Sequence, residues 1–364
     1  MCFYPNWRIA MKPRQVMFAF GSLAVRGYNP TNGAFVFPVS DKDYLEKLLS
    51  CFGTNMQQYI LDNLEQIPCG KCLQCRVNDS REWAQRATAE ATLYEHNWFV
   101  TLTYDNEHLP QPYWTIDRRD GEYRLCSPLV YDDFELFKKR LLEYFRDKYD
   151  HTGIRFLMCG EYGPKNGRPH YHTILFNCPL DDVKVISNVD LNGKKYTYCH
   201  SDILEQKWQK GFITIGNVNW DTTAYVARYV LKKFAAPQER EYLALCQELG
   251  CKPLPAEMRK ASLRPGLGRP YYELHKDEIY KYDKVVLPDG HLTKPCSYFD
   301  RLFDLEDSEL LDELKKMRKK RAEIALINEL RGKVNPDDYI AQKQDKFRRS
   351  ISKLKRTNVE KAPH

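Results

Sequence analysis

Between residues 98 and 234, stretches with a strand-like pattern alternate with stretches that have a helical pattern, and this order constrains the fold more than any other feature. Runs rich in β-branched and aromatic residues, which are typical of strands, occupy 98–104, 154–161, 170–176 and 211–218. Apolar residues spaced three or four apart predict helices at 131–149, 201–209 and 222–234. The turn sequence GPKNGR at 163–168 predicts a hairpin between two of the strands. This order predicts an α+β fold, an antiparallel sheet with helices on one face.

The rest of the chain divides into regions on either side of this core. The N-terminal region is irregular to residue 68 except for one predicted helix, and a cysteine cluster and a second helix follow, so that the regions are 1–97, with helices at 41–63 and 79–95, then the core at 98–235. Residues 236–303 are Pro-rich and predicted to be irregular, and residues 304–364 are predicted to form a basic helical tail. We therefore expect mostly helical additions at both ends of the core.

Composition and charge exclude several classes of protein. Hydrophobic residues make up 43% and charged residues 29% of the 364 residues, which is typical of soluble globular proteins. No apolar run approaches the roughly 20 residues that cross a bilayer, and the first residues do not resemble a signal peptide, so we expect no membrane partner. Twelve cysteines are too few for a disulfide scaffold of this length. The net charge of +7 is concentrated in residues 311–364, where 16 Lys and Arg face 8 Asp and Glu, and such a tail usually contacts nucleic acid, with a solvated helix as the alternative.

A pair of histidines is the sharpest chemical feature. His170 and His172 lie two residues apart on a predicted strand, so both imidazoles point to the same face, about 6–7 Å apart at the backbone. Glu161 ends the preceding strand and lies across the hairpin from them. Two imidazoles and a carboxylate with open water positions suit Mn²⁺, Mg²⁺ or Zn²⁺. The alternative is a pair of histidines on a half-exposed strand face.

A second feature lies on the helix predicted at 222–234. Tyr225 and Tyr229 lie four residues apart on one side of it, and Lys232 continues the stripe, with Lys233 as a neighbouring candidate. Together with a metal ion, a tyrosine that attacks and a lysine that neutralises charge could cleave a phosphodiester through a phosphotyrosine. A packed amphipathic helix with tyrosines at its rim is the alternative.

Three cysteines are spaced as two overlapping C-x-x-C motifs. Cys69, Cys72 and Cys75 could hold a structural Zn²⁺, which usually has four ligands. Cys2 and Cys51 are candidates for the fourth ligand, although neither lies in a supporting motif. Thiols at the start of a helix are the alternative interpretation.

Three segments resemble, in order, the three motifs of HUH-type rolling-circle replication initiators: FVTLTYD at 99–105, GEYGPKNGRPHYHTILF at 160–176 and YVARYVLKK at 225–233. The paired tyrosines and the stretch PCGKCLQCR…WAQR at 68–86 are most similar to the initiators of small single-stranded DNA phages of the gokushovirus type. The resemblance spans roughly residues 68–235 and implies an RRM-like or ferredoxin-like sheet.

The resemblance also implies roles for individual residues. His170 and His172 match the metal-binding pair and Glu161 the third ligand of Mg²⁺ or Mn²⁺, while Tyr225 and Tyr229 match the alternating nucleophiles and Lys232 the accompanying lysine. Such proteins nick the plus strand of the replicative form at the origin and stay linked to the 5′ end. A second cleavage and religation then release a single-stranded circle.

The same resemblance sets the expected partners and the rival functions. The expected partners are single-stranded and origin DNA and the helicase and polymerase of the host, in the cytoplasm of the host cell. One alternative is an HUH transposase or relaxase that acts on mobile-element ends. Another is a non-catalytic nucleic-acid-binding module that uses an RRM-like sheet and the basic tail.

Overall fold

The computed structural model describes residues 6–10, 28–29, 34–38, 42–70, 72–164, 166–191, 194–228, 236–288, 290–331 and 335–352. The chain forms two compact units, Met1–Asn78 and Asp79–His364. This division falls inside the region 1–97, and the other boundaries expected from the sequence remain predictions. In the described part of the chain, no helix combines the length and the apolar character that crossing a bilayer requires.

The first unit contains a small antiparallel sheet in a stretch that the sequence predicted to be irregular. Its strands pair in the order β2-β3-β1-β4, with bounds β1 (Asn6–Ala10), β2 (Tyr28–Asn29), β3 (Ala34–Pro38) and β4 (Glu65–Ile67). The single helix predicted at 41–63 is two helices, α2 (Lys42–Ser50) and α3 (Thr54–Asp62). They are separate because Gly53 has an extended backbone and begins α3 as its N-cap. Leu48 and Ile60 are fully buried and supply the apolar side of the two helices.

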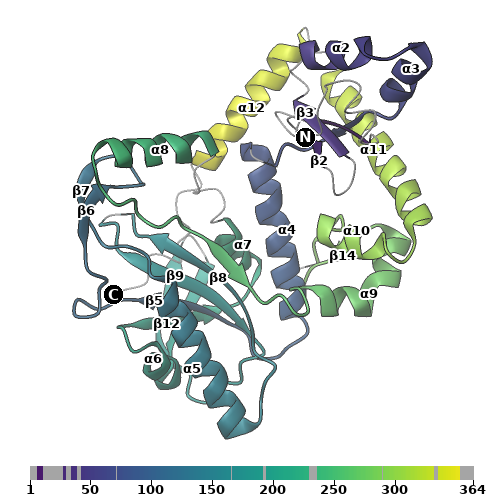
Figure 1. Ribbon diagram of the computed structural model, residues 1–364. Helices are drawn as coiled ribbons and strands as arrows, with labels where there is room; N and C mark the ends of the chain where they lie inside the picture. Colours follow the sequence, from purple (N-terminus) through teal and green to yellow (C-terminus); the bar gives the residue numbers. More distant parts are fainter. Residues whose placement is uncertain are drawn as a thin grey trace. The chain divides into compact units, whose positions relative to one another are not determined.

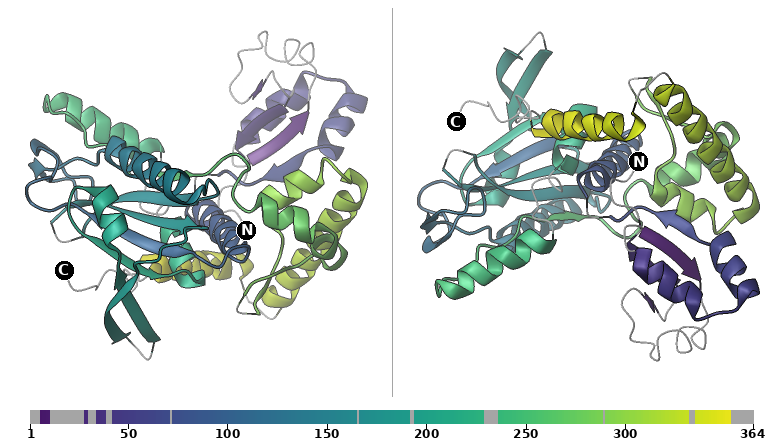
Figure 2. Two further views of the ribbon diagram at one scale, coloured as in Figure 1. Left: turned by 90° about the horizontal axis from the view of Figure 1, so that it is seen from below. Right: turned by 90° about the horizontal axis from the view of Figure 1, so that it is seen from above.

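The second unit is built on a seven-stranded sheet whose neighbouring strands are all antiparallel, in the order β10-β11-β12-β5-β9-β8-β13. The four predicted strands are β5 (Trp98–Thr103), β8 (Arg155–Tyr162), β9 (Pro169–Phe176) and β12 (Ile213–Asn217). The predicted hairpin is therefore confirmed as β8 and β9. The sequence did not predict β10 (Lys184–Leu191), β11 (Lys194–His200) and β13 (Arg259–Ala261). The first two extend from the sheet as a ribbon (Figure 2).

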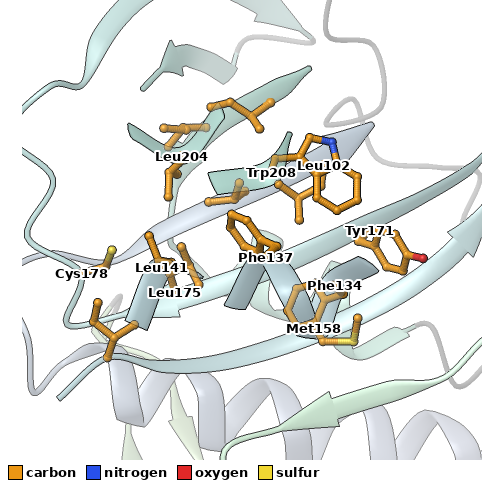
Figure 3. Close-up of a cluster of buried hydrophobic side chains, with 14 of the residues drawn as sticks. Leu102, Phe134, Phe137, Leu141, Met158, Tyr171, Leu175, Cys178, Leu204 and Trp208 are labelled. Carbon is orange, nitrogen blue, oxygen red and sulfur yellow. The ribbon is translucent and has the colours of Figure 1, made fainter. Parts of the chain in front are cut away.

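Two helices cover one face of this sheet, as predicted. They are α5 (Tyr131–Tyr149), which crosses the front of the sheet in Figure 1, and α6 (Asp202–Trp208). Phe134 and Phe137 of α5 and Trp208 of α6 are fully buried and pack on Leu102 and Leu175 of the strands (Figure 3). This cluster is the main hydrophobic core.

Helices also lie against the opposite face, which is where the structure differs from the predicted one-sided arrangement. This face packs against α4 (Leu73–Ala91), in its part beyond Asp79, and against α7 (Trp220–Arg228). The physical reason lies in β8 and β9, because almost every residue of both strands is buried. Leu157 and Ile174 face α4 and α7, whereas their neighbours Met158 and Leu175 face α5. A sheet that is apolar on both faces must be covered on both. The α+β class itself is confirmed.

Helices also occupy the Pro-rich region that the sequence predicted to be irregular. They are α8 (Ala236–Glu248), α9 (Arg269–Tyr282) and α10 (Ser297–Phe303), and two short hairpins are β6 (Tyr113–Ile116) with β7 (Tyr123–Cys126) and β14 (Val285–Val286) with β15 (Leu292–Thr293). Pro237 and Pro270 are the second residues of α8 and α9. Proline is compatible with the first helical turn, where its missing N–H has no helical partner to lose. The basic tail is helical as predicted, with α11 (Ser308–Leu330) and α12 (Pro336–Ser352).

Candidate active site

The strand register brings the two histidines and the glutamate to one face of the sheet. Glu161 lies directly opposite His170 across the β8–β9 pair, and His172 lies directly opposite Thr101 across the β5–β9 pair. Side chains of directly opposed residues share a face of the sheet. Because β9 has hydrogen-bonded neighbours on both sides, the backbones that carry the imidazoles are held by two ladders.

The three side chains converge closely enough to share one ion. One ligand atom from each of Glu161, His170 and His172 lies within 4.8 Å of the others. Glu161 is 1% exposed and His172 is 2% exposed. Since burying a carboxylate is costly unless a positive charge compensates it, a divalent cation suits this donor set.

Hydrogen bonds at the Nδ1 atoms orient both rings. The Nδ1 of His170 lies 3.1 Å from the carbonyl oxygen of Arg168. Because a carbonyl only accepts, this Nδ1 carries the proton and the lone pair is on Nε2. The Nδ1 of His172 lies 3.0 Å from the Thr101 hydroxyl, which can hold that ring in the same tautomer. Partners of this kind fix metal-ligating imidazoles.

Tyr225 of α7 brings its phenol to the same place. Its hydroxyl lies 3.3 Å from Nε2 of His172. The two rings meet edge to face with centroids 4.9 Å apart, and Phe99 stacks on the other side of His172 at 5.6 Å. Tyr225 is therefore the nearest described nucleophile of the predicted set to the three-ligand group. Tyr229, Lys232 and Lys233 lie outside the described residues.

Local contacts explain why α7 presents Tyr225 to the sheet. At the start of the helix, the Thr222 N–H donates to the side chain of Asn219, and the Asn219 N–H donates to the Thr222 hydroxyl, both at 2.9 Å. This reciprocal cap satisfies backbone donors that a helix start leaves exposed. The hydroxyl of Thr223 bonds that of Thr88 on α4 at 2.9 Å, and Val226 is fully buried against the sheet. The helix is thereby fixed on both of its packed sides.

A buried glutamate outside the predicted site residues connects α4, β8 and a glycine-rich loop. Glu90 is fully buried, its Oε1 lies 2.7 Å from Arg155 Nε, and its Oε2 accepts a hydrogen bond of 2.6 Å from the Gly268 N–H. Burial raises the pKa of Glu90, and the Gly268 N–H and the Arg155 charge oppose that rise. The loop around Gly268 thus receives a carboxylate of the protein itself. No sequence pattern marks such a pair, because it forms between distant segments.

The three predicted zinc ligands also come together, within the first unit. Ligand sulfurs of Cys69, Cys72 and Cys75 lie within 4.8 Å of one another. Cys51 is not part of that group, and its Sγ lies 3.2 Å from the carbonyl oxygen of Lys47. Cys2, the other candidate, lies outside the described residues.

Comparison with known proteins places the chain in a family. A family profile described as a replication-associated protein of the ORF2 type matches residues 97–234. Replication-associated protein ORF2 of Spiroplasma virus 4 is 34% identical over 307 residues, which cover 82% of this chain and 87% of the relative. Replication-associated protein VP4 of Bdellovibrio phage phiMH2K is 34% identical over 226 residues, 61% of this chain and 62% of the relative. Replication-associated protein ORF4 of Chlamydia phage 1 is 31% identical over 259 residues, 70% of this chain and 58% of the relative.

No solved structure matches the chain. The matched relatives nevertheless share one description and come from phages of one type, and the first of them is covered almost end to end. The chain belongs to the replication-associated proteins of Microviridae-type single-stranded DNA phages.

Proposed function

We propose that this protein is the endonuclease that nicks the replicative form of the phage genome at its origin and thereby starts rolling-circle replication. Membership of the replication-associated family supports a role in phage DNA replication. The observation that carries the proposal is the 3.3 Å separation between the Tyr225 hydroxyl and His172 Nε2. A nucleophile therefore lies beside two imidazoles and a carboxylate.

In the proposed reaction, the Tyr225 oxygen attacks the phosphorus of the scissile phosphodiester. The bond from phosphorus to the tyrosine oxygen forms as the bond to the 3′ oxygen of the preceding nucleotide breaks. The phenol proton is lost and the departing 3′ oxygen takes up a proton, so the products are a 5′-phosphotyrosine and a free 3′-OH. Because a phenol with a pKa of about 10 is a weak nucleophile at neutral pH, it needs a neighbouring positive charge.

Glu161, His170 and His172 would hold that charge as a divalent cation, Mg²⁺ or Mn²⁺. When bound, the cation would polarise the scissile phosphate and favour the phenolate. The protein contributes the fixed orientation of the rings through Arg168 and Thr101. A donor set of two imidazoles and one carboxylate leaves further coordination positions for water and phosphate oxygens.

We further propose that Tyr229 acts as the second nucleophile and that Lys232 neutralises charge on the phosphate. With two tyrosines, the regenerated origin can be cleaved while the first 5′ end is still attached, and the 3′-OH of one end can then attack the phosphotyrosine of the other. That attack releases a single-stranded circle. The reaction would take place in the host cytoplasm and would depend on a host helicase and polymerase.

The decisive experiment measures a covalent adduct. The full-length protein is incubated with a single-stranded origin oligonucleotide labelled on the 3′ side of the nick, with Mn²⁺, Mg²⁺ or a chelator, and separated under denaturing conditions. We expect an adduct that requires the metal and disappears when Tyr225 and Tyr229 are both changed to phenylalanine. Tyr144→Phe is the matched control, since Tyr144 belongs to α5 on the opposite face of the sheet and its hydroxyl contacts Lys148. An adduct that persists in the double variant would refute the assignment of the nucleophiles.

The same assay separates the rival functions. A transposase or relaxase would form adducts on hairpin or transfer-origin DNA in preference to phage origin DNA. A non-catalytic module would bind the oligonucleotide reversibly and form no adduct at any metal concentration. Cleavage of phage origin DNA with attachment to the 5′ end supports the proposal alone.

A further inference from the structure

We propose that Cys69, Cys72 and Cys75 bind one Zn²⁺ ion as thiolates and that this ion stabilises the N-terminal unit, separately from the Glu161, His170 and His172 group. The Sγ atoms of Cys69 and Cys75 lie 3.9 Å apart. Tetrahedral zinc with Zn–S bonds of about 2.3 Å holds its sulfurs about 3.8 Å apart. The observed separation therefore matches the edge of such a site, and the third sulfur lies within 4.8 Å of both.

The backbone between the first two cysteines is folded into a turn that points at a sulfur. Gly70 has a φ of 71°, a left-handed conformation that favours glycine. The turn directs the Cys72 N–H at the Cys69 Sγ, 3.3 Å away. A backbone N–H donated to sulfur stabilises the charged thiolate, the form that binds metal.

The start of α4 adds a second source of positive potential. The 19-residue helix begins at Leu73, immediately after Cys72, and Cys75 lies in its first turn. Helix N-termini carry partial positive charge and lower the pKa of nearby thiols. Arg76 follows in the same turn, where burial lowers its pKa and the neighbouring Cys72 opposes that effect. Three thiolates with one divalent ion carry a net charge of −1, which this cationic neighbour offsets.

The ligand chemistry selects the metal, and the size of the unit gives the ion a purpose. Thiolates favour zinc over Mg²⁺ and Mn²⁺, so the two groups of ligands would sort different ions. Zinc binding would release up to three thiol protons, and a water or another donor would complete the tetrahedron. The unit Met1–Asn78 is short, and domains of this length often depend on a metal or a disulfide because their cores are small. The ion would connect the turn after β4 to the first turn of α4.

The test measures zinc in the full-length protein purified under reducing conditions from zinc-supplemented medium. We expect about one equivalent of zinc that Cys72→Ser loses. It should persist in Cys51→Ser, the matched control from the same unit, and in the His170→Ala, His172→Ala double variant. Replacement of the zinc by Co²⁺ in the unmutated protein should give thiolate-to-metal charge transfer and the strong visible bands of a tetrahedral site. This spectrum keeps the proposal testable if Cys72→Ser does not fold.

Several results would overturn the proposal: no zinc in the unmutated protein, zinc retained after all three cysteines are changed to serine, a Cys69–Cys75 disulfide in the reduced protein, or iron and sulfide in place of zinc. These outcomes are distinct from failure of the proposed function. A protein that binds zinc but forms no adduct with origin DNA would refute the endonuclease and leave the zinc site standing.

Discussion

Replacing Thr101 by valine should weaken the dependence of adduct formation on the divalent cation while keeping the sheet intact. Valine has nearly the shape of threonine and suits a strand, but it lacks the hydroxyl that lies 3.0 Å from His172 Nδ1. Without that partner the ring can carry its proton on Nε2 instead. That nitrogen faces the Tyr225 hydroxyl and, when protonated, has no lone pair for a metal.

The size of the effect follows from the environment of the ring. His172 is 2% exposed, so water cannot readily replace the lost hydroxyl. Losing a hydrogen bond and leaving a buried polar atom without its partner costs about 1–3 kcal/mol, which corresponds to a factor of about 5 to 150. Removing partners of metal-bound histidines typically reduces metal affinity or activity about 10- to 100-fold. We therefore expect the Mn²⁺ concentration for half-maximal adduct formation to rise by about tenfold or more.

The assay is the initial rate of adduct formation across a Mn²⁺ titration. Thr101→Ser, which restores a hydroxyl, should recover most of the affinity. Thr103→Val is the matched control because Thr103 shares the strand and the face of Thr101, while its hydroxyl donates to the carbonyl oxygen of Phe212. An unchanged half-maximal Mn²⁺ concentration in Thr101→Val, with the fold preserved, would show that the hydroxyl does not orient the ring.

Two further predictions concern stability and follow from packing and charge. Phe137→Ala should lower the free energy of unfolding by about 3–5 kcal/mol, because Phe137 is fully buried under α5, whereas Leu136→Ala on the exposed side should change it little; denaturant titration measures both, and equal effects would contradict the core assignment. Burial tends to raise the pKa of Asp117, but hydrogen bonds and charge from Arg119, with the charge of Arg124, hold it below its usual value. A lowered carboxyl pKa stabilises the folded state above the pKa in the unfolded chain, about 3.9, and this contribution is lost as the pH falls through the folded value. Asp117→Asn should therefore be destabilising at neutral pH and progressively less so below about pH 4. A destabilisation that is independent of pH would exclude this origin.

The sequence sufficed for the parts of the fold that depend on local pattern. A period of two residues placed His170 and His172 on one face of a strand, and the turn at 163–168 located Glu161 across from them, as the register has it. The apolar spacing from 131 to 149 predicted α5 with the bounds that the structure has.

Other features depend on contacts between distant segments and could not be predicted in this way. Helical periodicity could not show which face of α7 meets the sheet, because Tyr225 is placed by contacts such as the one between Thr223 and Thr88. The partner of Glu90 is 178 residues away in sequence. Prolines that normally suggest a break begin α8 and α9 instead, and the N-terminal sheet joins short strands with few side-chain signals.

The imidazoles and the phenol are anchored to the molecule in different ways. The histidines belong to a central strand, which could move only if backbone ladders on two sides were broken. Tyr225 belongs to a nine-residue helix that touches the sheet through side chains. A helix of this kind can shift by sliding its packed surface, so a DNA end tethered to it could be carried aside and returned while the ion stays in register with the next incoming strand.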